Sequence, residues 1–194
     1  MNIKLKLLSI WTPKFILIRE LEKTTTITNE YLDRLIMDCS GSPPEEEVYK
    51  GNLEDRRACM AEGHNLRVKI LIDILGREMA YTLGKVEMFN AGLLLGQTTK
   101  EIFGIGNDVE DTINASKILY RILGINCFTE IQRDKIILWV KSCDLAQYYT
   151  PETCLIMSHA DKGVLKGLNK NMELEFVERI TSGSEYCKAC VNIE

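Results

Sequence analysis

The fold is decided by a stretch that begins after Gly124, where the hydrophobic pattern changes from helical spacing to strand-like runs. The first run is Ile125-Asn-Cys-Phe-Thr-Glu-Ile-Gln132, and the second is Lys135-Ile-Ile-Leu-Trp-Val-Lys141. Both contain β-branched and aromatic residues of the kind that strands prefer. Arg133-Asp134 lies between them, so the pattern predicts two antiparallel strands joined by a tight hairpin.

A helix and two more strands are predicted after this hairpin. Pro151 suits the first turn of a helix, because its missing N–H would be unpaired there anyway. The segment Met172-Glu-Leu-Glu-Phe-Val-Glu-Arg-Ile180 alternates apolar and charged residues for most of its length, which is typical of a half-buried strand. After a turn at Gly183, residues 186–193 are predicted as the last strand.

Residues 54–123 have the spacing of helices, with apolar side chains recurring every three or four residues. We expect one helix to end or bend at Gly84, a second to run over 85–103, and a third over 109–123 with Asp108 as its N-cap. The complete order is helices followed by ββαββ. It predicts an α+β fold in which helices pack on a four-stranded antiparallel sheet.

Residues 1–50 are less regular, so we interpret them as an N-terminal extension or arm on a single α+β domain of residues 51–194. Thr24-Thr-Thr-Ile-Thr28 is expected to be β-prone or a loop, and Thr28 can cap a helix over about 29–38. A linker is expected over 39–47. The arm is a candidate docking site for a protein partner.

Composition limits the classes of function. The net charge of -4 and the lack of a basic stripe argue against a nucleic-acid-binding protein. No uncharged run is long enough to span a bilayer. Met1–Trp11 lacks a long apolar centre and a cleavage site, so we expect a cytoplasmic protein. Seven cysteines, an odd number, favour reduced thiols over a disulfide framework.

The cysteines of the C-terminal quarter are the first candidate site. Cys143 ends a predicted strand, Cys154 lies at a helix start and Cys187 opens the last strand, so the three can converge at one edge of the sheet. A helix N-terminus also favours a thiolate. Cys187 and Cys190 form a C-x-x-C pair, although residues three apart on a strand face opposite sides. Buried structural cysteines are the alternative.

Acid–base residues accompany these thiols. Asp161 lies on the helical face of Cys154, whereas His159 lies off that face. Together with a thiol they are typical of nucleophilic or general acid–base chemistry. His64 follows Gly63 at the start of a helical stretch and equally fits a cap-region residue.

Single residues at characteristic positions give this part of the chain a recognisable pattern. The positions are Cys143-x-Leu-Ala, Cys154, Asp161, Gly167-x-Asn169 and Arg179-x-x-x-Gly183-x-x-x-Cys187. With this pattern the chain resembles the L-2-amino-thiazoline-4-carboxylic acid hydrolase family and the related 4-vinyl reductase (hydrocarbon-binding) domains, whose fold is shared with transport-particle subunits of the Golgi. The resemblance covers about residues 58–193.

The resemblance implies an α+β domain, often a homodimer, with one of two functions. The hydrolase branch opens a cyclic amidine. The 4-vinyl reductase branch binds a small apolar or tetrapyrrole-like ligand and uses cysteines for metal. The chain lacks the cysteine that this second pattern has shortly before Gly183, where Glu178-Arg-Ile-Thr stands, and it adds Cys190. The first difference favours the hydrolase branch, and the second leaves a metal site open.

Three functions therefore remain open. The first is a hydrolase of a C–N bond in a small cyclic amidine, with Cys154 as nucleophile (or Cys143 or Cys187), Asp161 or His159 for proton transfer, and Arg179 to anchor a carboxylate. The second is a non-catalytic sensor or carrier that holds an apolar ligand between helices and sheet. The third is a module that binds zinc or an iron–sulfur cluster through Cys143, Cys154, Cys187 and Cys190.

Overall fold

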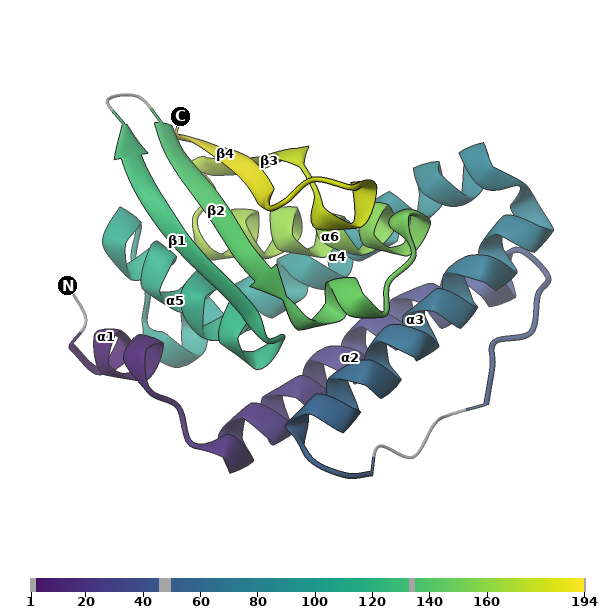
Figure 1. The fold of residues 1–194 in the computed structure, drawn as a ribbon, viewed down its shortest axis with the longest axis horizontal. Helices are drawn as coiled ribbons and strands as arrows, with labels where there is room; N and C mark the ends of the chain where they lie inside the picture. The colour runs from purple at the N-terminus through teal and green to yellow at the C-terminus, as the bar shows by residue number, and fades with distance from the viewer. Residues whose placement is uncertain (1–2, 46–49, 133–134, 194) are drawn as a thin grey trace.

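A four-stranded antiparallel sheet forms one side of the molecule (Figure 1). Its strands are β1 (Ile125–Gln132), β2 (Lys135–Cys143), β3 (Met172–Glu178) and β4 (Cys187–Ile193), and their spatial order is β1-β2-β4-β3. The computed structural model describes residues 3–45, 50–132 and 135–193, so the predicted hairpin turn lies outside the described residues. The predicted α+β class with four antiparallel strands is confirmed.

Helices α5 (Val109–Ile122) and α6 (Pro151–Leu168) cover the inner face of the sheet. Tyr120 of α5 and Leu165 of α6 belong to one hydrophobic cluster with inward-facing strand residues, which are Ile136, Leu138, Met172, Leu174, Ala189 and Val191. Both predicted helix starts are confirmed. The Asp108 side chain accepts a bond of 2.8 Å from the Asp111 N–H, and Pro151 occupies the first turn of α6.

The boundary that we placed at Gly84 is wrong, because α3 (Leu53–Leu75) ends at Gly76 and α4 runs unbroken over Arg77–Phe103. Gly76 has a φ of 74°, a left-handed conformation that glycine adopts without strain. Gly84 is needed for a different reason, since a Cβ there would lie 3.1 Å from the Ile156 side chain of α6. A glycine in a helical pattern marks close packing here, whereas the real break lies eight residues earlier.

The N-terminal segment is helical, with α1 over Ile3–Ile10 and α2 over Lys14–Asp38. The expected loop or strand at Thr24–Thr28 is therefore wrong, and so is the helix start near Asn29. The hydroxyl groups of Thr24, Thr25 and Thr28 donate to the carbonyl oxygens four residues earlier in the helix. Burial of Leu21, Leu32 and Ile36 against the rest of the chain outweighs the β-propensity of the threonines.

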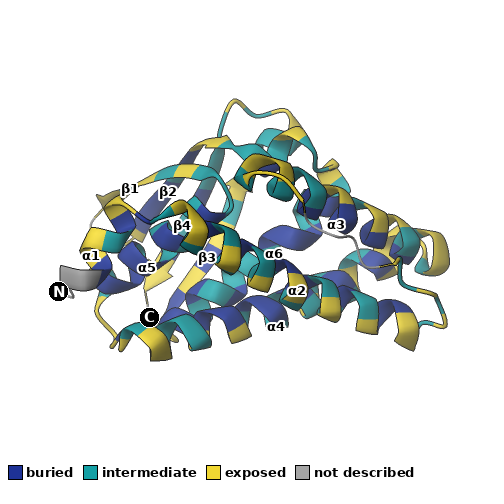
Figure 2. Ribbon diagram, turned by 90° about the horizontal axis from the view of Figure 1, so that it is seen from below, coloured by how far each residue is buried: buried dark blue, intermediate teal, exposed yellow. Residues whose placement is uncertain are grey.

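Helix α6 lies at the centre of the molecule, between the sheet and α4 (Figure 2), and none of its residues after Pro151 is exposed. Glycines allow its backbone to approach that of α4. A Cβ on Gly92 or Gly96 of α4 would overlap a backbone carbonyl oxygen of α6, and one on Gly163 or Gly167 of α6 would overlap a carbonyl oxygen of α4. We call these four glycines the glycine seam. It fixes α6, and the side chains that α6 carries, relative to α4.

Candidate functional site

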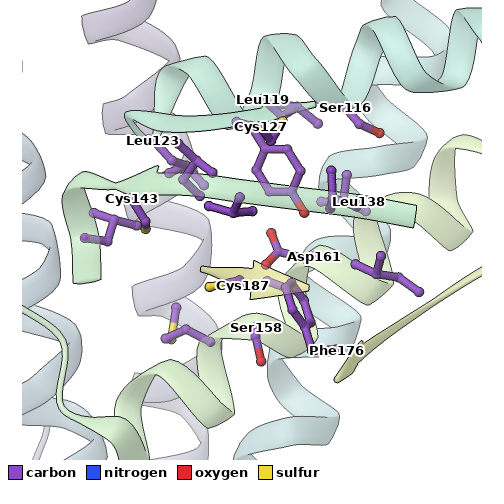
Figure 3. A pocket seen from close by; sticks show the side chains of 18 of the residues that line it. Ser116, Leu119, Leu123, Cys127, Leu138, Cys143, Ser158, Asp161, Phe176 and Cys187 are labelled. Carbon is purple, nitrogen blue, oxygen red and sulfur yellow. The ribbon is translucent and has the colours of Figure 1, made fainter. Parts of the chain in front are cut away.

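A cavity of about 160 Å³ lies between the inner face of the sheet and the helices. A site for a single water needs only about 10–15 Å³ of such volume, so the space suits a small organic molecule. Most of the lining is apolar and includes Leu119 and Leu123 of α5, Leu138 of β2 and Phe176 of β3 (Figure 3). The lining extends to Met60 and His64 of α3 and to Thr28 of α2.

Asp161 is the acid of this cavity. It lies on α6 one turn after Ser158, and the part of its surface that stays accessible faces the cavity (Figure 3). Burial raises the pKa of its carboxyl to about 7, although the positive charge of Arg179 opposes the rise. Within the described part of the chain, the Asp161 carboxyl has no hydrogen-bond partner and no ion pair within 4.0 Å. A carboxyl group in this setting is available to a bound molecule.

Arg179 also lines the cavity, at the point where β3 leads into the short 3₁₀ helix η2 (Ile180–Ser182). Its Nη2 donates to the Ser158 hydroxyl at 3.3 Å, and its guanidinium lies 5.1 Å from the centre of the Phe176 ring. Its Nε is buried and has no hydrogen-bond partner among the described residues. Because Ser158 precedes Asp161 by three residues on one helix, the arginine and the acid lie at the same end of the cavity.

Four cysteines line the cavity, namely Cys127, Cys143, Cys154 and Cys187. Burial raises the pKa of each thiol, to about 11 for Cys127 and to about 12 for Cys143. The positive charge of Arg179 opposes the rise at Cys154 and Cys187, and so does, at Cys187, the Ile180 N–H, which lies 3.3 Å from its sulfur. All four thiols are therefore protonated at neutral pH.

Cys190 does not belong to this group. It lies opposite Ile137 and Glu175 on the neighbouring strands, on the outward face of the sheet, whereas Cys187 lies opposite Val140 in the cavity lining. Across residues 3–45, 50–132 and 135–193, no three His, Cys, Asp or Glu side chains are placed to hold a metal ion. The four expected cysteine ligands do not fit zinc or an iron–sulfur cluster in this arrangement, so we derive no chemistry through a metal.

His159 is also separated from the other predicted catalytic residues, because it is not part of the cavity lining. Its Nδ1 lies 3.1 Å from the carbonyl oxygen of Leu155, one turn earlier on α6. Burial lowers the pKa of its imidazole to about 4, so the ring is neutral. The structure thus brings Cys154, Asp161 and Arg179 to one cavity and leaves His159 outside it.

A buried hydrogen-bonded chain, which was not predicted from the sequence, also lies in the lining of the cavity. Tyr149, His64 and Thr28 form it, with 2.7 Å from the Tyr149 hydroxyl to His64 Nδ1 and 2.9 Å from His64 Nε2 to the Thr28 hydroxyl. His64 lies in the middle of α3 and is 1% exposed, so its interpretation as a cap-region residue is wrong. Burial lowers the pKa of His64 to about 3. Nothing in the local sequence distinguishes such a histidine from a surface one.

Tyr120 is the second feature that sequence reasoning missed. It belongs to the apolar side of α5 and lines the cavity, and burial together with the nearby Asp161 charge raises the pKa of its phenol well above the usual value. In the sequence it only continues an apolar helical line. Its role at the cavity follows from the position of α5 against the sheet.

Comparisons with known proteins identify the fold. No protein-family model and no curated protein matches the sequence. Among solved structures, a trafficking protein particle complex subunit 3 from Naegleria fowleri, covalently bound to palmitic acid, is similar with a TM-score of 0.55 and 16% identity, over 71% of this chain and 95% of that one. The phenol-responsive sensory domain of the transcription activator PoxR, solved with phenol, is similar with a TM-score of 0.52 and 16% identity, over 77% of each chain. The chain shares the α+β fold of these two proteins, as the predicted fold class implied.

Proposed function

We propose that this chain binds one small, largely apolar molecule in the cavity and acts as a sensor or carrier domain. The observation that carries the proposal is the cavity of about 160 Å³ with an apolar lining and, at one end, the Asp161 carboxyl, which has no partner among the described residues. Small-molecule sites in proteins are mostly apolar and contain a few polar groups that orient the ligand. This cavity has that composition.

The polar end of the cavity indicates the kind of ligand. Asp161 offers an acceptor when ionised and a donor when protonated, and Arg179 has a buried N–H without a partner in the described structure. A ligand with one neutral group that both donates and accepts a hydrogen bond, such as a hydroxyl, satisfies both residues. An ammonium group on the ligand would be repelled by the positive charge of Arg179, and a carboxylate would be repelled by Asp161 when that residue is ionised. The apolar remainder of the ligand would lie against Leu119, Leu138 and their neighbours.

The two structural neighbours support a binding function. One holds palmitic acid and the other holds phenol, so the fold has accommodated both an acyl chain and a small aromatic ring. At 16% identity this support concerns the architecture alone, and the ligand of this chain is inferred from its own lining residues.

A pair of matched variants tests the proposal. The purified protein is extracted with organic solvent for mass spectrometry, and then titrated with phenol and with palmitic acid by calorimetry. Cys127→Phe places a ring in the cavity, whereas Cys190→Phe makes the same change on the outward face of the sheet. We expect one ligand per chain, at least tenfold weaker binding for Cys127→Phe, and unchanged binding for Cys190→Phe. Absence of an extracted ligand together with no binding of either probe would contradict the proposal.

Hydrolysis of a C–N bond is the second candidate, and one observation favours it. Cys154, Asp161 and Arg179 of the predicted catalytic set all line the cavity, and a carboxyl with a pKa of about 7 is suited to proton transfer near neutral pH. The protonated thiols argue for Asp161, not a cysteine, as the group that activates water. Incubation with L-2-amino-thiazoline-4-carboxylic acid, followed by chromatography, tests this candidate. Turnover that is lost in Asp161→Asn but retained in Cys154→Ser would support it.

A further inference from the structure

Four large apolar side chains stand exposed between residues 7 and 15, at the corner where α1 leads into α2. Their exposed fractions are 64% for Leu7, 66% for Ile10, 70% for Trp11 and 70% for Phe15. We call these residues the N-terminal apolar face. In Figure 2 the α1 corner shows exposed residues close to the N-terminus, at one end of the molecule. Such a concentration of exposed large apolar residues in one short segment marks an interaction surface.

The opposite side of the same segment packs on the protein, so the orientation of the apolar face is fixed. Leu5, Ser9 and Thr12 are buried, and the Ser9 hydroxyl lies 3.5 Å from the Asn114 side chain of α5. Leu7, Ile10 and Trp11 follow the spacing of one helical side, and the Trp11 N–H still bonds to the carbonyl oxygen of residue 7 at 3.0 Å. The exposed side chains of Leu7, Ile10 and Trp11 therefore point away from α5, and Phe15 is exposed in the first turn of α2.

The charge of this segment differs from that of the rest of the chain. Residues 1–19 contain four basic residues and no acidic one, although the whole chain has 24 Lys and Arg against 28 Asp and Glu. The other residues, from 20 to 194, accordingly contain 20 basic and all 28 acidic side chains. Two of the basic groups have acidic neighbours, since Lys6 lies 4.0 Å from Glu110 and Arg19 lies 2.7 Å from Glu20. Lys14 is exposed and has no ion pair in the described structure.

We propose that the N-terminal apolar face docks this protein on the surface of an anionic lipid bilayer. Tryptophan and phenylalanine favour the boundary between headgroups and acyl chains, and lysines beside them attract anionic headgroups. The contrast in charge also orients the molecule, because the acidic remainder is repelled from the surface that attracts residues 1–19. No described helix is both long and apolar enough to cross a membrane.

A second copy of the chain is a less suitable occupant of this face. In a two-fold dimer the same patch meets itself, and residues 1–19 of the second copy offer no acidic side chain to the exposed Lys14. Anionic lipid supplies the opposite charge. The proposal concerns this corner alone and does not depend on ligand binding in the cavity.

Fluorescence gives a direct test, because the chain has only two tryptophans. In a Trp139→Phe background, Trp11 becomes the single reporter at the apolar face. The full chain is mixed with vesicles of phosphatidylglycerol or of phosphatidylcholine, and the emission of Trp11 and co-sedimentation are measured. We expect a blue shift of emission and sedimentation with the anionic vesicles, and at least tenfold weaker binding to the neutral ones.

Matched variants connect the binding to the apolar face. Ile10→Ser with Phe15→Ser should weaken sedimentation with anionic vesicles at least tenfold, whereas Ile102→Ser with Ile131→Ser removes two equally exposed apolar side chains elsewhere and should not. Circular dichroism confirms that each variant is folded.

Charge variants and light scattering complete the test. Lys14→Glu should weaken the binding several-fold. Lys170→Glu, at an exposed position just after the end of α6, should not. An unchanged emission of Trp11 with anionic vesicles would overturn the proposal. So would light scattering that shows a dimer abolished by the serine variants of the apolar face without any binding to vesicles.

Discussion

Replacement of Asp161 by asparagine should stabilise the protein more at pH 8 than at pH 5. Burial in the apolar cavity raises the pKa of the Asp161 carboxyl from 3.8 to about 7, against the opposing charge of Arg179. In the unfolded chain the same carboxyl ionises at about pH 4. Between these two pH values the folded protein binds one more proton than the unfolded chain, so its stability falls as the pH rises.

The magnitude follows from that change in pKa. The pKa rises by about 3, and each pKa unit corresponds to about 1.4 kcal/mol, so the upper limit is about 4 kcal/mol. Water that enters the cavity solvates the carboxylate, so we expect about 2 kcal/mol at pH 8. Asparagine has a similar shape and does not ionise, so the variant retains at pH 8 the stability that the wild type has only in acid. For a chain of this length the expected increase in Tm is about 4–8 °C.

Urea unfolding followed by circular dichroism at pH 5 and pH 8 measures this effect. The control is Asp73→Asn on α3, where the side chain is 63% exposed and substitution should change the free energy of unfolding by less than about 0.5 kcal/mol at either pH. An equal effect of Asp161→Asn at the two pH values would refute the reasoning, because the carboxyl would then ionise alike in the folded and unfolded chains.

Three further substitutions test the structure around the cavity. In the glycine seam, Gly92→Ala should lower the free energy of unfolding by about 2–3 kcal/mol, whereas Gly106→Ala, where a Cβ meets open space, should change it by less than about 1 kcal/mol in thermal unfolding. Burial lowers the pKa of His64 to about 3, so wild type should lose more stability than His64→Gln as the pH falls from 7 to 4 in urea titrations. Arg67→Met leaves the Asp33 carboxylate unpaired and should cost about 3 kcal/mol, part of which Asp33→Leu should restore in a double-mutant cycle.

The segments that form the sheet could be predicted because the residue patterns that indicate strands extend over only a few neighbouring residues. Successive side chains of a strand point to opposite faces of the sheet, so a strand with one buried face shows alternating apolar and polar residues, as Met172–Glu178 does. The apolar run of β2 is likewise visible within a few residues. Asp108 and Pro151 mark helix starts by chemistry that acts within three or four residues. Cys143, Cys154 and Cys187, which we expected to converge, all contribute to the lining of the cavity, although no three His, Cys, Asp or Glu side chains in the described part of the chain are grouped closely enough to hold a metal ion.

The failed predictions depended on contacts between distant segments. The threonines of α2 are helical because neighbouring apolar residues are buried against the rest of the chain, and Gly84 lies inside a helix because Ile156 packs against it. Neither effect leaves a local signal. The same reason explains why His64 equally fitted a cap-region residue in the sequence and why the Tyr149 partner, 85 residues later, was not anticipated.

The sequence by itself determined the α+β class, the order of helices and strands from residue 53 onward, and the residue types available for a site, because periodicity and capping act over a few residues. The tertiary structure alone decided that a cavity exists and that Asp161 and Arg179 lie at one end of it, while His159 and Cys190 lie elsewhere. It also decided the protonation of the site. A pKa depends on the solvent and charges that surround a group, and here those surroundings come from α5, α6 and all four strands.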